Sequence, residues 1–243
     1  MCSVRAATVF EVAVARRIQR FLEARGIVVH RRDHVRYGSD PLLDLERLLP
    51  SVDTILDVGA NEGQTALPLA EAFPQAKVFA FEPVPDTFDR LRAHTADEPR
   101  IECFQMALGV DEGEATIRLA DKSGQNSLLN AAEPGPGTVT IPVSRGDAWA
   151  SAHDVEHIDV LKVDAEGYDL EVLTGFEEML DANKVEAVLV ECEFDRVRPE
   201  PHTSFFALHD YLSAHGMSFT TLYTDSVSSK RFAWGNALFV RAA

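Results

Sequence analysis

The sequence has few cysteines, few basic residues relative to acidic ones and no long apolar run. Each shortage argues against a class of protein. Three cysteines in 243 residues, without C-x-x-C spacing, indicate neither a disulfide framework nor a thiolate metal site. No stretch of about 18 uncharged apolar residues occurs, so we expect no membrane span. A formal net charge of −16 disfavours nucleic-acid partners, because their binding depends on Lys and Arg neutralising phosphates.

Charged residues also interrupt the amino-terminal segment. Arg5, Glu11 and Arg16 leave no apolar region typical of a secretory signal, so we expect a cytoplasmic protein. Helical spacing of apolar residues predicts a helical extension at residues 1–50, with helices near 6–25 and 41–49, which either packs on the rest of the chain or acts as a lid. The remaining residues, 51–243, suit one large α/β domain.

Residues 54–83 carry the clearest functional pattern. Ile55–Val58 is a short apolar run typical of a buried strand, and the glycine turn Gly59–Gly63 follows it. A helix-like stretch and a second strand then lead to Glu82. In parallel α/β sheets, ligands lie at the carboxyl ends of the strands, where an acidic residue accepts hydrogen bonds from ribose hydroxyls. The pattern therefore predicts a ribose-bearing cofactor.

The same turn indicates which cofactor is expected. A dinucleotide fingerprint needs G-x-G-x-x-G, but Asn61 stands at its second glycine and Asp57 comes just before the turn. A carboxylate facing the pocket would repel a pyrophosphate and would suit a ligand with an amino group. D-V-G-A-N-E-G and the distal Glu82 resemble motifs I and II of the class I methyltransferases. That resemblance implies S-adenosylmethionine, which carries a ribose, an ammonium and a sulfonium.

A further motif indicates a family. V-L-K-V-D-A-E-G-Y-D-L-E-V-L-T-G-F at 160–176 comes after D-V-G-A-N-E-G-Q-T and F-E-P and before V-E-C-E-F. Together these motifs resemble the FkbM family of S-adenosylmethionine-dependent O-methyltransferases. The resemblance implies methyl transfer to a hydroxyl of a small molecule, a sugar or a polyketide-type natural product. We expect that acceptor as the partner, with no nucleic acid and no membrane, and we leave a homodimer open.

The resemblance also assigns cofactor-binding residues at the carboxyl ends of the strands. They are Asp57, Gly59, Asn61, Gly63, Thr65, Glu82, Pro83, Gln105, Met106, Ala107 and Asp164. Two of them have structural alternatives, because Asp57 could merely bond nearby amides and Asn61 could merely adopt a left-handed conformation. Their occurrence together with Glu82 favours cofactor binding.

Methyl transfer to a hydroxyl needs a group that removes the proton, because a hydroxyl is a poor nucleophile at pH 7. We assign this catalytic role to Asp164, Glu166 and Glu191, which follow or end the central strands, and expect Asp164 to face the transferred methyl. Asp164 and Glu166 could instead cap the next helix. Mg²⁺ at these carboxylates is an alternative that we do not expect, since FkbM-like proteins are not generally described as metal enzymes. Lys162 is unusual in an apolar strand and is best explained as an apolar stem paired to an acid.

The element pattern predicts an α/β fold, the doubly wound, Rossmann-like sheet of class I methyltransferases in the order 3-2-1-4-5-7-6. Residues 114–119 and 138–143 alternate as strands do and predict an inserted β-hairpin that carries N-S-L at 126–128. The third strand is expected at 101–106, and one helix at 168–180. The last two strands, near 219–223 and 237–240, lack a helical crossover between them and should pair antiparallel.

Two other functions stay open. The first is an NAD(P)-dependent oxidoreductase on the same sheet, disfavoured by the missing glycine and by the antiparallel last strand. The second is a non-catalytic nucleoside-binding module that has kept the fold. Loss of Asp57 or Glu82 would favour that module, and both residues are present.

Overall fold

A computed structural model describes residues 21, 25, 34–119, 126–130, 132–194, 203–228 and 231–242. The chain forms two compact units, Met1–Ser39 and Asp40–Ala243. In the first unit the guanidinium of Arg25 lies over the ring of Phe21, 3.6 Å from its centroid. The helix expected at 6–25 otherwise falls outside the described residues, and the lid stays a prediction.

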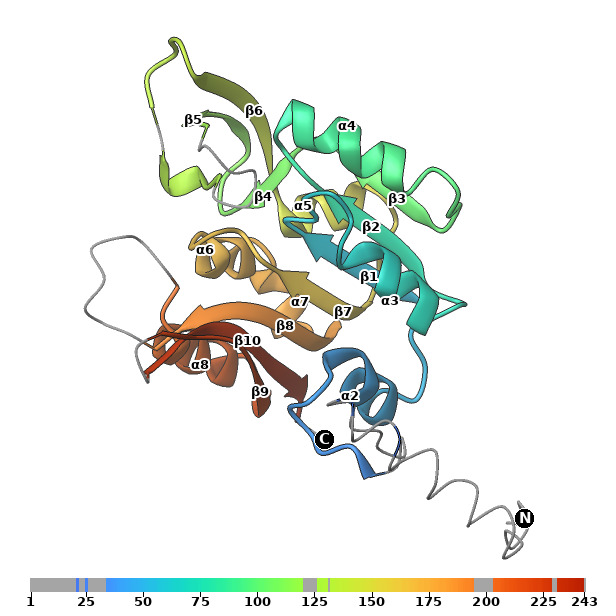
Figure 1. The fold of residues 1–243 in the computed structure, drawn as a ribbon. Helices are drawn as coiled ribbons and strands as arrows, with labels where there is room; N and C mark the ends of the chain where they lie inside the picture. Colours follow the sequence, from blue (N-terminus) through green and yellow to red (C-terminus); the bar gives the residue numbers. More distant parts are fainter. Residues whose placement is uncertain are drawn as a thin grey trace, which may run out of the picture. The chain divides into compact units, whose positions relative to one another are not determined.

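Seven strands form one sheet in the second unit (Figure 1). In spatial order they are β3 (Ile101–Phe104), β2 (Lys77–Phe81), β1 (Thr54–Val58), β7 (Ile158–Val163), β8 (Val185–Glu193), β10 (Arg231–Arg241) and β9 (Met217–Ser228). The first five pair in parallel, whereas β10 pairs antiparallel with both β8 and β9. The predicted strand order and the antiparallel last strand are therefore confirmed.

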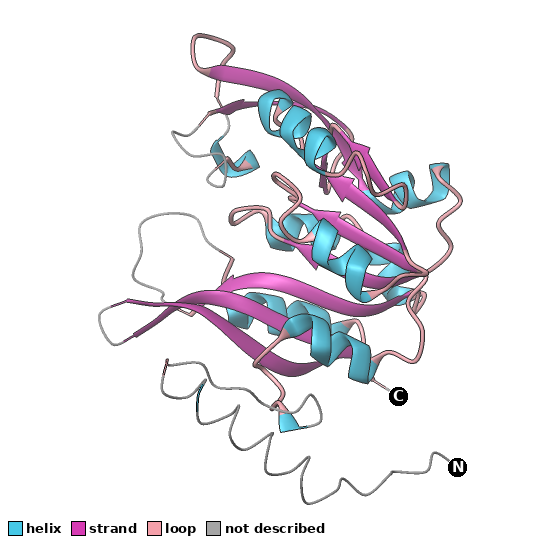
Figure 2. Cartoon of the chain, turned by 45° about the vertical axis from the view of Figure 1, so that its right-hand side comes forward, coloured by secondary structure: helices cyan, strands magenta, loops and turns pink. Residues whose placement is uncertain are grey.

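Helices cover both faces of this sheet, as a doubly wound fold requires (Figure 2). One face carries α2 (Pro41–Leu48), α3 (Ala66–Ala72) and α4 (Pro85–His94), and the other carries α5 (Gly146–Ala152), α6 (Asp169–Thr174), α7 (Glu177–Asp181) and α8 (Phe205–Ala214). Successive residues of a strand point to opposite faces. Ile55 accordingly packs in the core with Leu69 of α3, and Leu56 packs in the core with Leu173 of α6.

A smaller sheet is inserted between β3 and α5. It consists of β4 (Ala107–Gly109), β6 (Thr138–Arg145) and β5 (Gly113–Arg118), with β5 and β6 paired antiparallel. The expected hairpin is thus confirmed, but the expectation that the third strand of the main sheet runs to Met106 is wrong. The chain leaves that sheet after Phe104, because Ala107 is buried in a separate apolar cluster with Ile117 and Ile141 of the insertion.

The single helix expected at 168–180 is two helices, α6 and α7. Gly175 lies between them, and a Cβ at this glycine would be only 2.2 Å from the carbonyl oxygen of Gly109. Two amides at the start of α7 donate to the carboxylate of Asp147, at 3.0 and 3.1 Å. Asp147 therefore caps a new helix instead of letting the first one continue. Both partners come from distant segments, so local spacing could not show the break.

This contact makes a stability prediction. Gly175 has φ −64°, which alanine adopts readily, so Gly175→Ala tests the steric contact alone. We expect the free energy of unfolding to fall by about 1–3 kcal/mol, because the new methyl must displace backbone. Gly135→Ala is the control, because the nearest atom to its Cβ is 3.9 Å away. Urea unfolding that gives equal stability for both variants would contradict the close packing of Gly175.

Candidate active site

A cavity of about 280 Å³ opens at the carboxyl ends of β1, β2 and β7. It lies where the strand order reverses between β1 and β7, the place where open α/β sheets bind ligands. The predicted site residues that line it are Gly59, Asn61, Thr65, Glu82, Pro83, Met106, Ala107, Asp164 and Glu166. Residues more than a hundred positions apart thus meet in one cavity.

Four predicted site residues do not line the cavity. Asp57 is fully buried in β1 next to it, and Gly63 faces Leu91 and Thr95 of the α4 region. Gln105 is exposed, because the chain turns towards the small sheet after β3. Glu191 lies in β8, one strand further from the centre of the cavity.

Several lining residues were not assigned from the sequence. They are Val58, Ala60, Gln64, Phe81, Val84, Leu108, Ile117, Asn126, Ser127, Leu128, Ile141, Lys162, Ala165 and Tyr168. The inserted N-S-L segment reaches the cavity, and the Ser127 hydroxyl donates to the carbonyl of Ala165 at 3.5 Å. The sequence predicts the hairpin that carries this segment, but the position of the segment in the cavity depends on tertiary contacts that the sequence does not show.

The turn after β1 is shaped by close packing. Gly59 has φ 77°, and a Cβ there would lie 1.8 Å from the carbonyl oxygen of Asp164, so only glycine fits. The amide of Gly59 donates to the carbonyl of Phe81 at 3.1 Å. Asn61 has φ 47°, in the left-handed region, and its buried Oδ1 has no hydrogen-bond partner within the described part of the chain. The turn thus offers a side-chain acceptor to the cavity.

A buried ammonium lies between two carboxylates beside the turn. Parallel pairing puts Lys162 of β7 opposite Asp57 of β1, with Nζ 3.6 Å from Oδ1 of Asp57 and 3.1 Å from Oδ2 of Asp164. Burial disfavours the charged amine, but the two carboxylates outweigh it and raise the pKa of Lys162. Burial also raises the pKa of Asp57, with the Lys162 ammonium opposing the shift. The predicted pairing of Lys162 to an acid is confirmed.

Glu82 is largely buried at the end of β2. Its Oε1 accepts a hydrogen bond from the amide of Val84 at 2.9 Å, which orients the carboxyl group. Burial raises the pKa of Glu82 to about 7, although backbone donors partly oppose the shift. A ligand hydroxyl that donates to this carboxylate would favour its ionised form.

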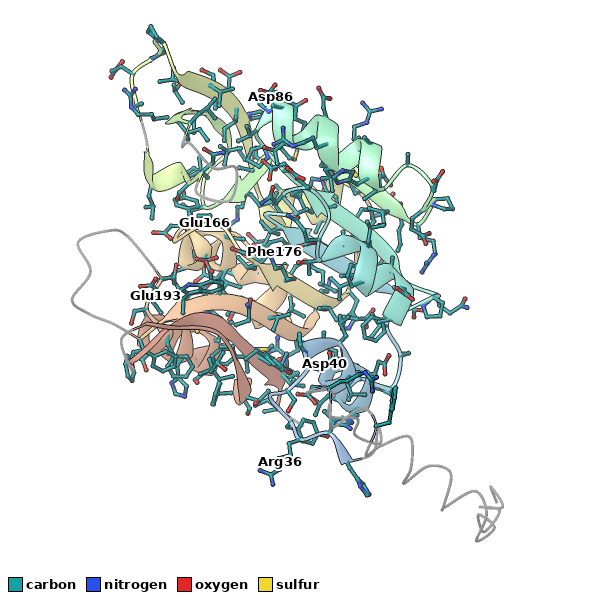
Figure 3. The ribbon with its side chains drawn as sticks, viewed as in Figure 1. Arg36, Asp40, Asp86, Glu166, Phe176 and Glu193 are labelled. Atoms are coloured by element: carbon teal, nitrogen blue, oxygen red, sulfur yellow. The ribbon has the colours of Figure 1, made fainter. Side chains whose placement is uncertain are left out.

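Further carboxyl groups gather near the turn after β7. Figure 3 shows Glu166 and Glu193 at the edge of the sheet where β7 and β8 end. Glu166 lines the cavity with φ 50°, and burial together with Asp164 raises its pKa to about 7. Burial and the same carboxylate raise the pKa of Glu191 to about 9. At neutral pH this edge therefore holds protons that ordinary carboxyl groups would release.

Asp169 fixes the backbone that carries these acids. Its carboxylate accepts hydrogen bonds from the amides of Ala165 and Gly167, at 2.8 and 3.2 Å, and from the hydroxyl of Thr203 at 2.7 Å. The side chain is almost fully buried, and burial raises the pKa of Asp169. Asp169 thus holds the turn on which Glu166 sits, a role not expected from the sequence.

The described residues contain no group of three or more His, Cys, Asp and Glu side chains placed to hold a metal ion. Within the same residues, no helix is both long and apolar enough to cross a bilayer.

Comparison with known proteins shows the family. The methyltransferase FkbM domain matches residues 57–219, more than half of the chain. A hexuronic acid methyltransferase, AglP of Haloferax volcanii, is 34% identical over 140 residues, which cover 57% of this chain and 55% of that protein. A 2-O-methyltransferase, NoeI of Sinorhizobium fredii, is 26% identical over 141 residues, 52% of this chain and 58% of that protein. The chain matches little more than half the length of either relative.

The chain therefore belongs to the FkbM family of S-adenosylmethionine-dependent methyltransferases. The cavity fits that cofactor, because it presents hydrogen-bond acceptors and the cofactor is rich in donors. Asn61 lines the cavity and its buried Oδ1 has no hydrogen-bond donor in the described residues, and the Glu82 carboxylate belongs to the same lining. Ribose hydroxyls, an adenine amino group and an ammonium supply such donors. Family membership also argues against the nicotinamide oxidoreductase alternative.

The raised pKa of Glu191 predicts how stability changes with pH. Above the unfolded value of 4.5 the unfolded chain has released this proton, whereas the folded protein keeps it to about 9. The unfolded state binds fewer protons in this window, so the free energy of unfolding falls as pH rises through it. Urea unfolding between pH 5 and 9 should show this loss, and Glu191→Gln should reduce it. An identical pH dependence in both proteins would contradict the shifted pKa.

Proposed function

We propose that this protein transfers a methyl group from S-adenosylmethionine to a hydroxyl of a small molecule, most simply a sugar. The observation that carries this proposal is a cavity at the strand-order reversal that Glu166, an acid with a raised pKa, lines after the end of β7. Two relatives support the acceptor class, because their names specify a hexuronic acid and a 2-O position. A polyketide-type hydroxyl is the alternative acceptor.

In this proposal the nucleoside end of the cofactor binds along β2 and the small sheet. Glu82 accepts hydrogen bonds from the ribose hydroxyls, and Pro83 follows it in the cavity wall. Met106 and Ala107, with Ile117 of the insertion, form an apolar wall that suits an adenine ring. This wall exists because the chain leaves the main sheet after β3.

The amino-acid end binds over the turn after β1. Gly59 brings the backbone close to the cavity, and Asn61 offers its orphaned carbonyl oxygen to a ligand donor. Thr65 lines the same side. Asp57 acts from beneath as a buried carboxylate that favours a cationic ligand, while Gly63 keeps the turn close to α4.

The proton of the acceptor hydroxyl goes to Glu166 in this proposal. S-adenosylmethionine, when bound, supplies the electrophilic methyl of its sulfonium. A base works best when its pKa lies near the working pH, and the pKa of Glu166 is about 7. Asp164 lines the same cavity, but Lys162 holds one of its oxygens at 3.1 Å, so Asp164 orients the acceptor. Glu191 lies outside the cavity lining and stays protonated when Glu166 ionises, because its own pKa is about 9.

Glu82 makes cofactor affinity depend on pH. Ribose hydroxyls donate to the ionised carboxylate, whereas ligand-free Glu82 is half protonated near pH 7. Binding of S-adenosylhomocysteine should therefore strengthen as pH rises from 6 to 8 and should release protons below pH 7. Calorimetry in buffers of different ionisation enthalpy measures both effects. Glu82→Gln should bind about tenfold more weakly and lose this pH dependence; unchanged binding would place the ribose elsewhere.

Substitutions should separate the roles of the two carboxylates at the rim. Glu166→Gln should lower kcat by about 10²–10⁴ and leave S-adenosylhomocysteine affinity within about twofold. Asp164→Asn should mainly raise KM for the acceptor. In the wild type, kcat should rise with pH through about 7, as Glu166 ionises. If Asp164→Asn removes turnover and Glu166→Gln does not, Asp164 is the base.

The acceptor class itself is tested by product mass. The protein is incubated with S-adenosylmethionine and matched panels of hexoses, hexuronic acids, sugar glycosides and hydroxylated polyketides. The expected product is a sugar heavier by one methylene group and methylated on oxygen. Methylation confined to polyketides would move the acceptor to the alternative class, and N- or C-methylation would contradict the proposal.

A further inference from the structure

The cavity contains one positive side chain. Of the described residues that line it, four are charged, and Lys162 is the only basic one beside Glu82, Asp164 and Glu166. Its side chain is only 5% exposed, in the middle of the sheet. A cation at this depth is costly unless it is paired, and the carboxylates of Asp57 and Asp164 supply that pairing.

Three amides in the turns after β1 and β7 already have partners within the protein. The amide of Gly59 donates to the carbonyl of Phe81, and the amides of Ala165 and Gly167 donate to the carboxylate of Asp169. Glycine turns that bind anions do so with amides that point free into the site. These three amides are already used within the protein and are not available to an anionic ligand group.

The ammonium of Lys162 has capacity left for such a group. An ammonium carries three N–H donors. Oδ2 of Asp164 takes one at 3.1 Å, and Oδ1 of Asp57 lies at 3.6 Å, beyond hydrogen-bond distance. At least one donor is therefore available to a ligand, next to carboxylates that could pair with a ligand ammonium. A zwitterionic amino-acid group matches this alternation of charges.

We propose that Lys162 binds a carboxylate that enters this cavity, which rests on the proposed function. Two ligands could bring that carboxylate, the methionyl end of the cofactor or an acidic sugar acceptor. In both cases Lys162 is a ligand-binding residue and not only the counter-ion of Asp57 and Asp164. A matched ligand that carries a neutral group in place of the carboxylate should lack this contact.

The test compares ligands that differ only in the carboxylate. S-adenosyl-3-thiopropylamine is S-adenosylhomocysteine without that group. Lys162→Met should weaken S-adenosylhomocysteine by about tenfold or more in calorimetry, and weaken the amine by less than about twofold. A second arm titrates D-glucuronate and D-glucose into the S-adenosylhomocysteine-loaded protein. Selective loss of D-glucuronate binding, with cofactor affinity unchanged, assigns the carboxylate to the acceptor.

Lys162→Met alone leaves Asp57 without its counter-ion, so a second pair of variants removes the charge of Asp57 as a control for misfolding. Asp57→Asn and Asp57→Asn/Lys162→Met differ only at Lys162 and should show the same selective loss, with circular dichroism checking the fold. Equal losses for ligands with and without a carboxylate, or no loss in either arm, would overturn the role of Lys162. A wild-type protein that binds neither adenosyl ligand would instead overturn the proposed function.

Discussion

The turn after β1 and the turn after β7 meet at a single point, where the α-carbon of Gly59 lies against the carbonyl of Asp164. A methyl group at Gly59 would be 1.8 Å from that oxygen, and the amide of Asp164 donates to Val58 at 3.0 Å. These contacts hold the two strand ends together and fix the distance between the two sides of the cavity. The same pairing of strands brings Lys162 next to Asp57.

Burial of carboxyl groups sets the chemistry of this edge. Glu82 and Glu166 are acids with pKa values near 7, and Glu191 has one near 9, because each loses solvation in the fold. Glu82 and Glu166 therefore change charge near neutral pH, which suits a ribose contact and removal of a hydroxyl proton, whereas Glu191 stays protonated. Keeping these acids buried lowers the stability of the fold. Such a loss is typical of residues with a functional role rather than a structural one.

Local motifs could be predicted from the sequence, and contacts between distant segments could not. The strand, the turn and Glu82 can be recognised because they belong to one contiguous unit, residues 54–83. The antiparallel last strand follows from the missing helical crossover before β10. The break at Gly175 depends on Gly109 and Asp147, which come from other parts of the chain. Gln105 was assigned to the cavity because the third strand was expected to continue, but burial of Ala107 in the small sheet turns the chain away.

The most direct test of this account is a crystal structure of the protein with S-adenosylhomocysteine. The account predicts the ligand at the carboxyl ends of β1, β2 and β7, with a ribose hydroxyl about 3 Å from the carboxylate of Glu82. It also predicts that the sulfur lies on the side of the cavity lined by Glu166. A ligand bound outside this cavity, or a ribose without contact to Glu82, would contradict it.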